Sequence, residues 1–102
     1  MSDHQTDNAG DDLLDAAIRV PEHVIFRSFA SETVALNLET GTFHGLNSTA
    51  GRMVELIARA RCARDAVGQL AEEYGVPDEQ IAADMQNLLQ VLIDRSLIEI
   101  HG

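Results

Sequence analysis

The sequence predicts an α+β domain in which a three-stranded antiparallel sheet precedes three helices. Two short β-rich runs flank Glu39-Thr40-Gly41, and a third such run lies before them. Beyond residue 47 the apolar residues instead recur every three or four positions, which is the spacing of one helix face. At 102 residues the chain is long enough for one modest core. We therefore expect a single folded domain.

The three strands are expected at 24–29, 33–38 and 42–46. The turns between them are too short for crossovers, so the strands should pair in sequence order. Gly41 can supply the positive φ that the end of the second hairpin loop requires. Within the middle strand the residues alternate between two faces, with Val34, Leu36 and Leu38 on one and Ala35 and Asn37 on the other.

The helices follow directly. Asn47 or Ser48 can cap the first helix. The second is expected at about 64–74, with Gly75 just beyond its end. The third should start near Pro77, which the first turn of a helix tolerates, and run to about residue 95. The apolar segment 97–100 should pack back as a strand or an extended tail.

The apolar residues of the third helix cover an arc of roughly 200°, wider than the ~100° that a helix on one core needs. One interpretation is that this helix packs against both the sheet and the other helices. The other is that one flank lines a groove that a partner fills. The arc consists of Ile81, Ala82, Met85, Leu88, Leu89, Val91, Leu92 and Ile93.

Residues 1–16 are expected to form a disordered acidic tail, and residues 17–102 the folded domain. Up to residue 12 the chain carries four aspartates and no large apolar residue after Met1, too little to offset the entropy of ordering. This start resembles neither a secretory signal nor a transit peptide. No apolar run is long enough to span a membrane, and the single cysteine, Cys62, fits a reducing compartment. We expect a cytoplasmic protein.

The net charge of −10 argues against nucleic acid as a partner, since phosphate backbones are bound mainly through lysine and arginine. All seven basic residues are arginines. The acidity is compatible with a basic partner, and equally with plain solubility.

The sequence carries no recognisable catalytic or metal-binding constellation. The four histidines show no i, i+4 pairing and no cysteine company. No glycine-rich phosphate loop and no nucleophile motif occur, and Ser48 lacks the sequence context of a carrier-protein serine. We therefore predict a protein that is not an enzyme, without cofactor or metal.

The string from Leu36 to Ala50, LNLETGTFHGLNSTA, resembles the hallmark of the PqqD-like family, and the order of short motifs between 66 and 98 is also similar. The resemblance covers about Val20 to Ile100. It implies a winged helix-turn-helix-like fold and a recognition element for RiPPs, which are ribosomally made and post-translationally modified peptides. Such a domain binds the leader of a precursor peptide and presents it to a leader peptidase, a cyclase or a radical SAM-type modifying enzyme.

In the family, the leader adds as an antiparallel strand to the third strand, and its side chains enter a cleft beside the third helix. By position, the resemblance assigns peptide binding to Thr42, Phe43, His44, Gly45 and Leu46 on the strand and to Asp84, Met85, Leu88 and Val91 on the helix. Edge-strand hydrogen bonds with pockets for alternate side chains are a known way to bind peptides. The chain lacks the tryptophan of family members that act in pyrroloquinoline quinone synthesis, and looks closer to the leader-binding proteins of lasso-peptide clusters.

Two alternatives from other classes remain open. A winged-helix DNA-binding regulator shares this topology, although its recognition helix should be basic. A structural dimerisation module would use the free edge strand for self-pairing, so the oligomeric state could be a monomer or an edge-paired dimer.

Overall fold

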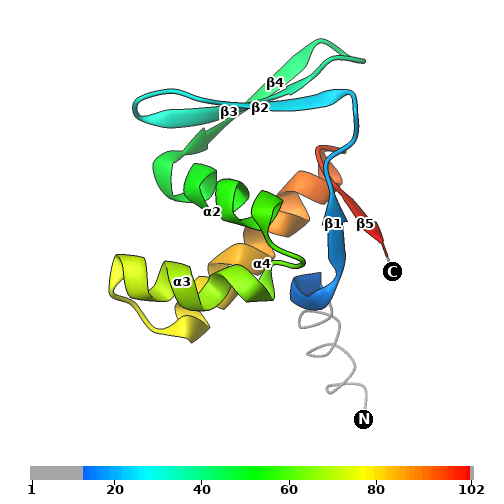
Figure 1. The fold of residues 1–102 in the computed structure, drawn as a ribbon. Helices are drawn as coiled ribbons and strands as arrows, with labels where there is room; N and C mark the ends of the chain where they lie inside the picture. Colours follow the sequence, from blue (N-terminus) through cyan, green and yellow to red (C-terminus); the bar gives the residue numbers. More distant parts are fainter. Residues whose placement is uncertain (1–12, 102) are drawn as a thin grey trace.

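A computed structural model describes residues 13–101 of the chain. It places a three-stranded sheet above a layer of helices, with a small two-stranded ribbon at one end (Figure 1). The elements are β1 (Ala17–Arg19), β2 (Val24–Ser28), β3 (Glu32–Asn37), β4 (Thr42–Asn47), α2 (Ser48–Arg59), α3 (Arg64–Tyr74), α4 (Asp78–Asp94) and β5 (Glu99–His101). The predicted α+β class, with three antiparallel strands and then three helices, is confirmed.

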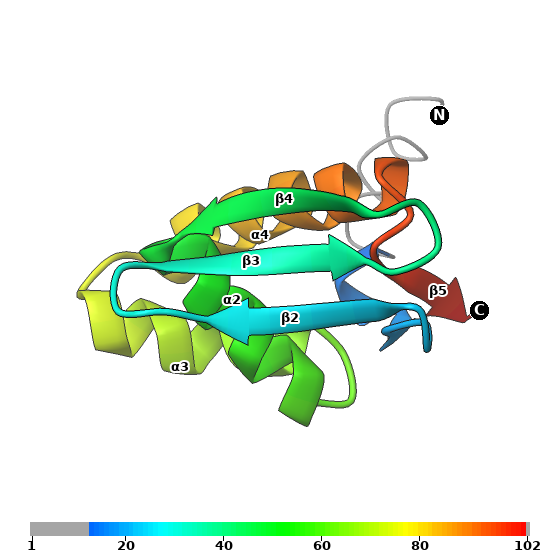
Figure 2. The same ribbon diagram turned by 90° about the horizontal axis from the view of Figure 1, so that it is seen from above.

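The larger sheet has the order β2-β3-β4, and both pairings are antiparallel. Figure 2 shows β4 along one edge and β2 along the other. The connection between β3 and β4 is tight because Gly41 adopts φ +74°. The side chain of Asn37 supports this turn by accepting hydrogen bonds from the N–H groups of Glu39 (2.9 Å) and Thr40 (3.2 Å).

The predicted alternation along β3 is present, and the smaller side chains face the helices. Thr33, Ala35 and Asn37 are buried, whereas Val34 and Leu36 lie half-buried on the outer face of the sheet. The reason is close packing of α2 against β3 and β4. A Cβ atom at Gly51 of α2 would lie only 2.3 Å from Thr33 Oγ1, so only small groups fit between helix and sheet at this point.

The helix boundaries follow the predicted signals. Asn47, not Ser48, caps α2, since its Oδ1 accepts a hydrogen bond of 2.8 Å from the N–H of Ala50. Gly75 ends α3 in the left-handed conformation at φ +66°. Helix α4 begins directly after Pro77. Its core-facing residues are Ile81, Met85, Leu89 and Leu92, each at most 3% exposed.

The ribbon of β1 and β5 was only half predicted. The terminal segment does form a strand, but its partner at 17–19 shows too short a pattern to predict from sequence. Arg19 pairs in register with Glu99, and their side chains form an ion pair. This hydrogen-bonded contact raises the pKa of the Arg19 guanidinium.

The expected tail boundary at residue 16 is wrong, because the fold already includes residues 13–16. Leu14 is 1% exposed and belongs to the hydrophobic core. Asp15 forms an ion pair with Arg64 of α3. The leucine side chain has apolar area to bury, and the aspartates at 11, 12 and 15 obscure this signal in the sequence. Residues 1–12, to which the rest of the tail prediction applies, lie outside the described residues.

Candidate peptide-binding edge

Strand β4 has a free edge, and the hydrogen-bonding pattern shows which of its backbone groups point outward. The N–H of Phe29 donates to the C=O of Glu32 at 2.7 Å, so this pair is a hydrogen-bonded one. Hydrogen-bonded and non-bonded pairs alternate along an antiparallel ladder. The even-numbered residues of β3 therefore bond to β2, and the odd-numbered ones bond to β4.

The same alternation continues into β4. Residues 42, 44 and 46 are the partners of the odd-numbered β3 residues, so their backbone groups point into the sheet. Phe43, Gly45 and Asn47 consequently direct their N–H and C=O groups away from it. This row of unpaired donors and acceptors is what an additional strand would bind.

The side chains of β4 alternate between the two faces of the sheet. Thr42, His44 and Leu46 share the face of Ala35, which is turned toward the helices. Leu46 is 5% exposed and belongs to the core, so it has no accessible surface to offer a ligand. Phe43 lies opposite Leu36 on the outer face and is 74% exposed. Of the five predicted strand residues, Thr42 and His44 thus direct their side chains to the helical side of the sheet. Phe43 and Gly45 offer their outward backbone N–H and C=O groups to an additional strand.

A hollow of about 260 Å³ lies between the beginning of β4 and the end of α4. We call it the β4 groove. Its lining residues are Ala35, Thr42, Phe43, His44, Arg95 and Leu97. Arg95 and Leu97 were not predicted as site residues. For Arg95 a signal was available in the sequence, because it continues the helical spacing of Asp84, Leu88 and Val91.

The four predicted residues of α4 divide into two groups. Asp84, Leu88 and Val91 recur at intervals of four and three residues, which places them on one stripe with Arg95. Asp84 and Val91 are exposed, and Leu88 is half-buried. Met85 is 0% exposed and packs in the core. Met85 thus has no accessible surface in the ligand-free structure, and its assignment to peptide binding stays a prediction.

A second, larger hollow of about 370 Å³ lies beside β2, the other edge of the sheet. Its walls are mainly apolar and come from β1, β2, α2 and α4. Two of the lining residues, Leu89 and Leu92, are core residues at most 1% exposed. The hollow's one polar lining side chain, Arg19, is already paired with Glu99. The β2 edge is the natural comparison in any test of the site.

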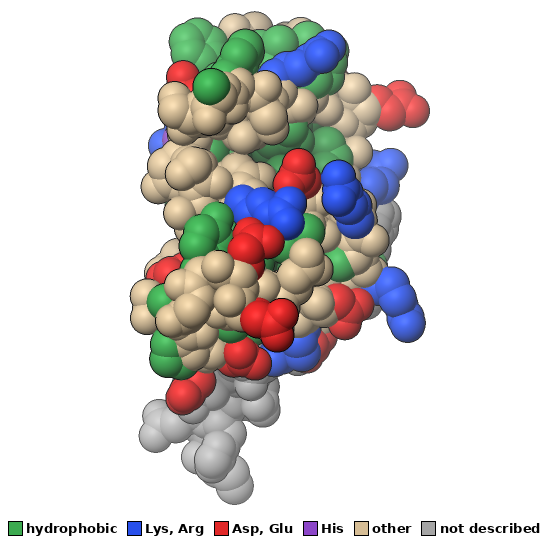
Figure 3. All heavy atoms as spheres, turned by 60° about the vertical axis from the view of Figure 1, so that its left-hand side comes forward, with side chains coloured by type: hydrophobic (Ala, Val, Ile, Leu, Met, Phe, Trp, Pro, Cys, Tyr) green, Lys and Arg blue, Asp and Glu red, His purple; other side chains and the backbone are tan. Residues whose placement is uncertain are grey.

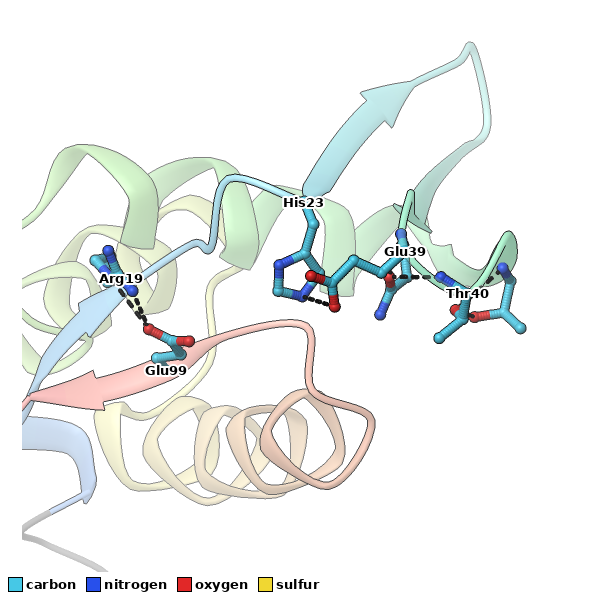
Figure 4. A network of polar contacts seen from close by, with 7 residues as sticks. Arg19, His23, Glu39, Thr40 and Glu99 are labelled. Atoms are coloured by element: carbon cyan, nitrogen blue, oxygen red, sulfur yellow. Dashed lines mark hydrogen bonds and ion pairs between the residues drawn. The ribbon is translucent and has the colours of Figure 1, made fainter.

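Polar contacts hold the surroundings of the groove in place. Figure 4 shows His23, in the loop before β2, next to Glu39 in the turn between β3 and β4, with 3.8 Å between Nε2 and Oε1. Within the same turn the hydroxyl groups of Thr40 and Thr42 are hydrogen-bonded at 2.7 Å. The first contact links the hairpin to the loop before β2, at the end of the sheet where the groove lies, and the second lies within the hairpin.

The surface charge is mixed over the helices, as Figure 3 shows, whereas apolar side chains gather over the sheet at the top of that view. Within residues 13–101, no three His, Cys, Asp or Glu side chains are grouped so that they could hold a metal ion. Nor does this part of the chain contain a helix with the length and apolar character needed to cross a membrane.

The chain was compared with known proteins and structures. The family model "Coenzyme PQQ synthesis protein D (PqqD)" matches residues 32–98. A solved structure described as TbiB1 in complex with the TbiA(beta) leader peptide is 25% identical, with a TM-score of 0.75 over 82% of this chain and 98% of that one. A second, lasso peptide synthetase B1 complexed with the leader peptide, is 21% identical, with a TM-score of 0.75 over 82% and 99% of the two chains, and supports the fold alone. No curated protein matches the sequence.

Proposed function

Since this chain belongs to the PqqD family, we propose that it binds the leader of a ribosomally made precursor peptide and brings it to a modifying enzyme. The leader adds as an antiparallel strand to the free edge of β4. Its alternate side chains point toward the β4 groove and the exposed stripe of α4. The leader-peptide complex of the similar TbiB1 structure supports this assignment.

The observation that carries the proposal is the combination of edge and groove. The outward backbone groups of Phe43, Gly45 and Asn47 supply affinity that tolerates different sequences, as in other cases of strand addition. The side chains of Thr42, His44 and Arg95 beside this edge supply hydrogen-bonding groups for selectivity. Binding by such an edge needs no catalytic group, so the protein acts as a non-catalytic partner of a leader peptidase, a cyclase or a radical SAM-type enzyme.

A DNA-binding role fits the structure less well. In a winged helix the recognition helix carries positive charge toward phosphates. The exposed charged residues of α4 are instead acidic apart from the cap: Asp78, Glu79, Asp84, Asp94 and Arg95.

The test is hydrogen exchange of backbone amides, with and without a synthetic leader peptide taken from any short precursor gene found next to the gene of this protein. The amides of Phe43, Gly45 and Asn47 should gain protection on binding because their N–H groups acquire partners. Those of residues 42, 44 and 46 are already bonded to β3 and serve as internal controls. Protection gained along β2 instead would move the site to the other edge, and no protection at saturating leader would refute strand addition.

A further inference from the structure

The stripe of α4 beside the groove carries one charge of each sign, at opposite ends. Asp84 and Arg95 are eleven positions apart, about 16 Å along a helix. The side chains between them on the stripe, Leu88 and Val91, are apolar. Among residues 13–101, neither the carboxylate of Asp84 nor the guanidinium of Arg95 forms a hydrogen bond or an ion pair. Both charges are therefore available to a ligand.

The direction of α4 relative to β4 is also defined. Arg95, at the end of α4, lines the groove together with Thr42 and His44 at the beginning of β4. Figure 2 shows that the two elements run in opposite directions along this side of the molecule. A strand antiparallel to β4 therefore runs parallel to α4. Its N-terminal part lies toward the Asp84 end of α4, and its C-terminal part lies toward Arg95.

We propose that the protein reads the order of charges in the leader, in addition to its shape. The inference rests on the proposed function. A basic residue of the leader meets Asp84, and an acidic residue further along meets Arg95, with apolar residues between them. A strand advances about 3.3 Å per residue, so ~16 Å corresponds to about five residues. Because side chains on one face recur every second residue, the spacing is four or six.

The chemistry of the two groups suits this role. A guanidinium stays charged and can donate two parallel N–H bonds to a carboxylate, which fixes geometry as well as charge. A leader with the opposite order would place like charges together at both ends, and such repulsion provides specificity. The net charge of −10 favours basic peptides in general, but only a cation at one end of the stripe distinguishes the two orders.

Groups near Arg95 do not neutralise it. Asp94 is its neighbour in the chain, but its Oδ1 accepts a hydrogen bond of 3.0 Å from Nε2 of Gln90, on the adjacent face of the helix. The carbonyl groups at the end of α4 attract Arg95 only weakly, as is usual for a cation at a helix C-terminus. Its guanidinium thus remains the cation that lines the β4 groove.

The experiment selects a displayed library of random 16-residue peptides on the full-length protein and sequences the bound fraction. Peptides with a basic residue four or six positions before an acidic one should be enriched about fivefold over the reverse order, the scale of a partly exposed ion pair. Arg95→Gln should remove the preference for the acidic residue alone, and Asp84→Asn that for the basic one. The double variant Asp84→Arg/Arg95→Asp should reverse the order.

The controls are Arg61→Gln and Glu72→Gln, which make the same charge changes at exposed positions away from the groove and should retain the wild-type preference. Circular dichroism verifies that each variant is folded. If the double variant is not folded, the two single variants still test whether Asp84 and Arg95 set the preferred order of charges. Bound peptides without a charge order overturn this inference and leave the proposed function intact. A library from which the wild-type protein enriches no peptide overturns both.

Discussion

The side chain of Arg52 on α2 holds both carboxylate oxygens of Glu73 on α3, with Nε–Oε2 at 2.9 Å and Nη2–Oε1 at 2.8 Å. Arg52 also forms an ion pair with Glu55 of its own helix. This two-pronged geometry fixes the guanidinium in orientation, as bidentate pairs do. The hydrogen bonds from Arg52 lower the pKa of Glu73 below its usual value of 4.5.

The first prediction concerns acid stability. A carboxyl group whose pKa is lowered by folding stabilises the protein above its unfolded pKa, and this contribution is lost as the pH falls through the lowered value. Below about pH 4.5 the wild type should therefore lose stability more steeply than Glu73→Gln. Urea denaturation at pH 7 and at several acidic values measures this. The neighbouring variant Glu72→Gln should follow the wild-type profile, and identical profiles for Glu73→Gln and the wild type would contradict the prediction.

The cap of α2 gives a second prediction. Asn47→Ala should lower the free energy of unfolding by about 1 kcal/mol, because the N–H of Ala50 loses its acceptor. The matched variant is Ser48→Ala, which replaces the first residue of the helix and should change the stability by less than about 0.5 kcal/mol. Thermal or chemical denaturation of both variants checks this. Equal losses would mean that the two residues share the capping role.

Replacing glycine by alanine is expected to have opposite effects on stability at Gly51, where α2 contacts β3, and at Gly68 on α3. Gly51→Ala should destabilise the fold by about 1–3 kcal/mol, since the new methyl group would overlap Thr33. Gly68→Ala on α3 has nothing within 4 Å of the added atom and should stabilise by about 0.5–1 kcal/mol through helix propensity. The melting temperatures of the two variants should move in opposite directions. A stabilising Gly51→Ala would show that α2 can shift away from the sheet at little cost.

The corrected start of the domain supplies a fourth prediction. Leu14→Ala should cost about 2–5 kcal/mol, the usual range for a large side chain removed from a core. Leu13 is only half-buried, so Leu13→Ala should cost clearly less. In the same experiment, a chain that begins at residue 13 should be as stable as the whole protein, and one that begins at residue 17 should not. Equal stability of the two shortened chains would restore the original boundary at residue 16.

Most of the fold could be predicted from local signals. Gly41, Asn47 and Gly75 mark a turn, a cap and a helix end through backbone requirements that few other residues meet. Leu14 and strand β1 were missed because each depends on partners far along the chain; Arg19 of β1 and Glu99 of β5 are eighty positions apart. The inward side of β3 was equally hidden, since it is decided by how closely Gly51 lets α2 approach.

The family resemblance, carried over by position, assigned the candidate site to β4 and one flank of α4, and the structure places the start of β4 beside the end of α4. The resemblance could not show that Phe43 points to the outer face or that Met85 is covered. Arg95 was overlooked because it stands just beyond the apolar residues that marked the helix, as its cap.

The opposed directions of β4 and α4 have a consequence for the enzyme partner that we propose. A precursor docked antiparallel to β4 has its leader's C-terminal end next to Thr42, beside the tight turn at Gly41. If the portion of the precursor to be modified follows the leader, it leaves the domain at that turn, where Figure 2 shows β3 joined to β4. The catalytic partner would therefore have to approach from this end of the molecule. The position of the turn between β3 and β4 would set how far the reaction centre lies from the docking strand.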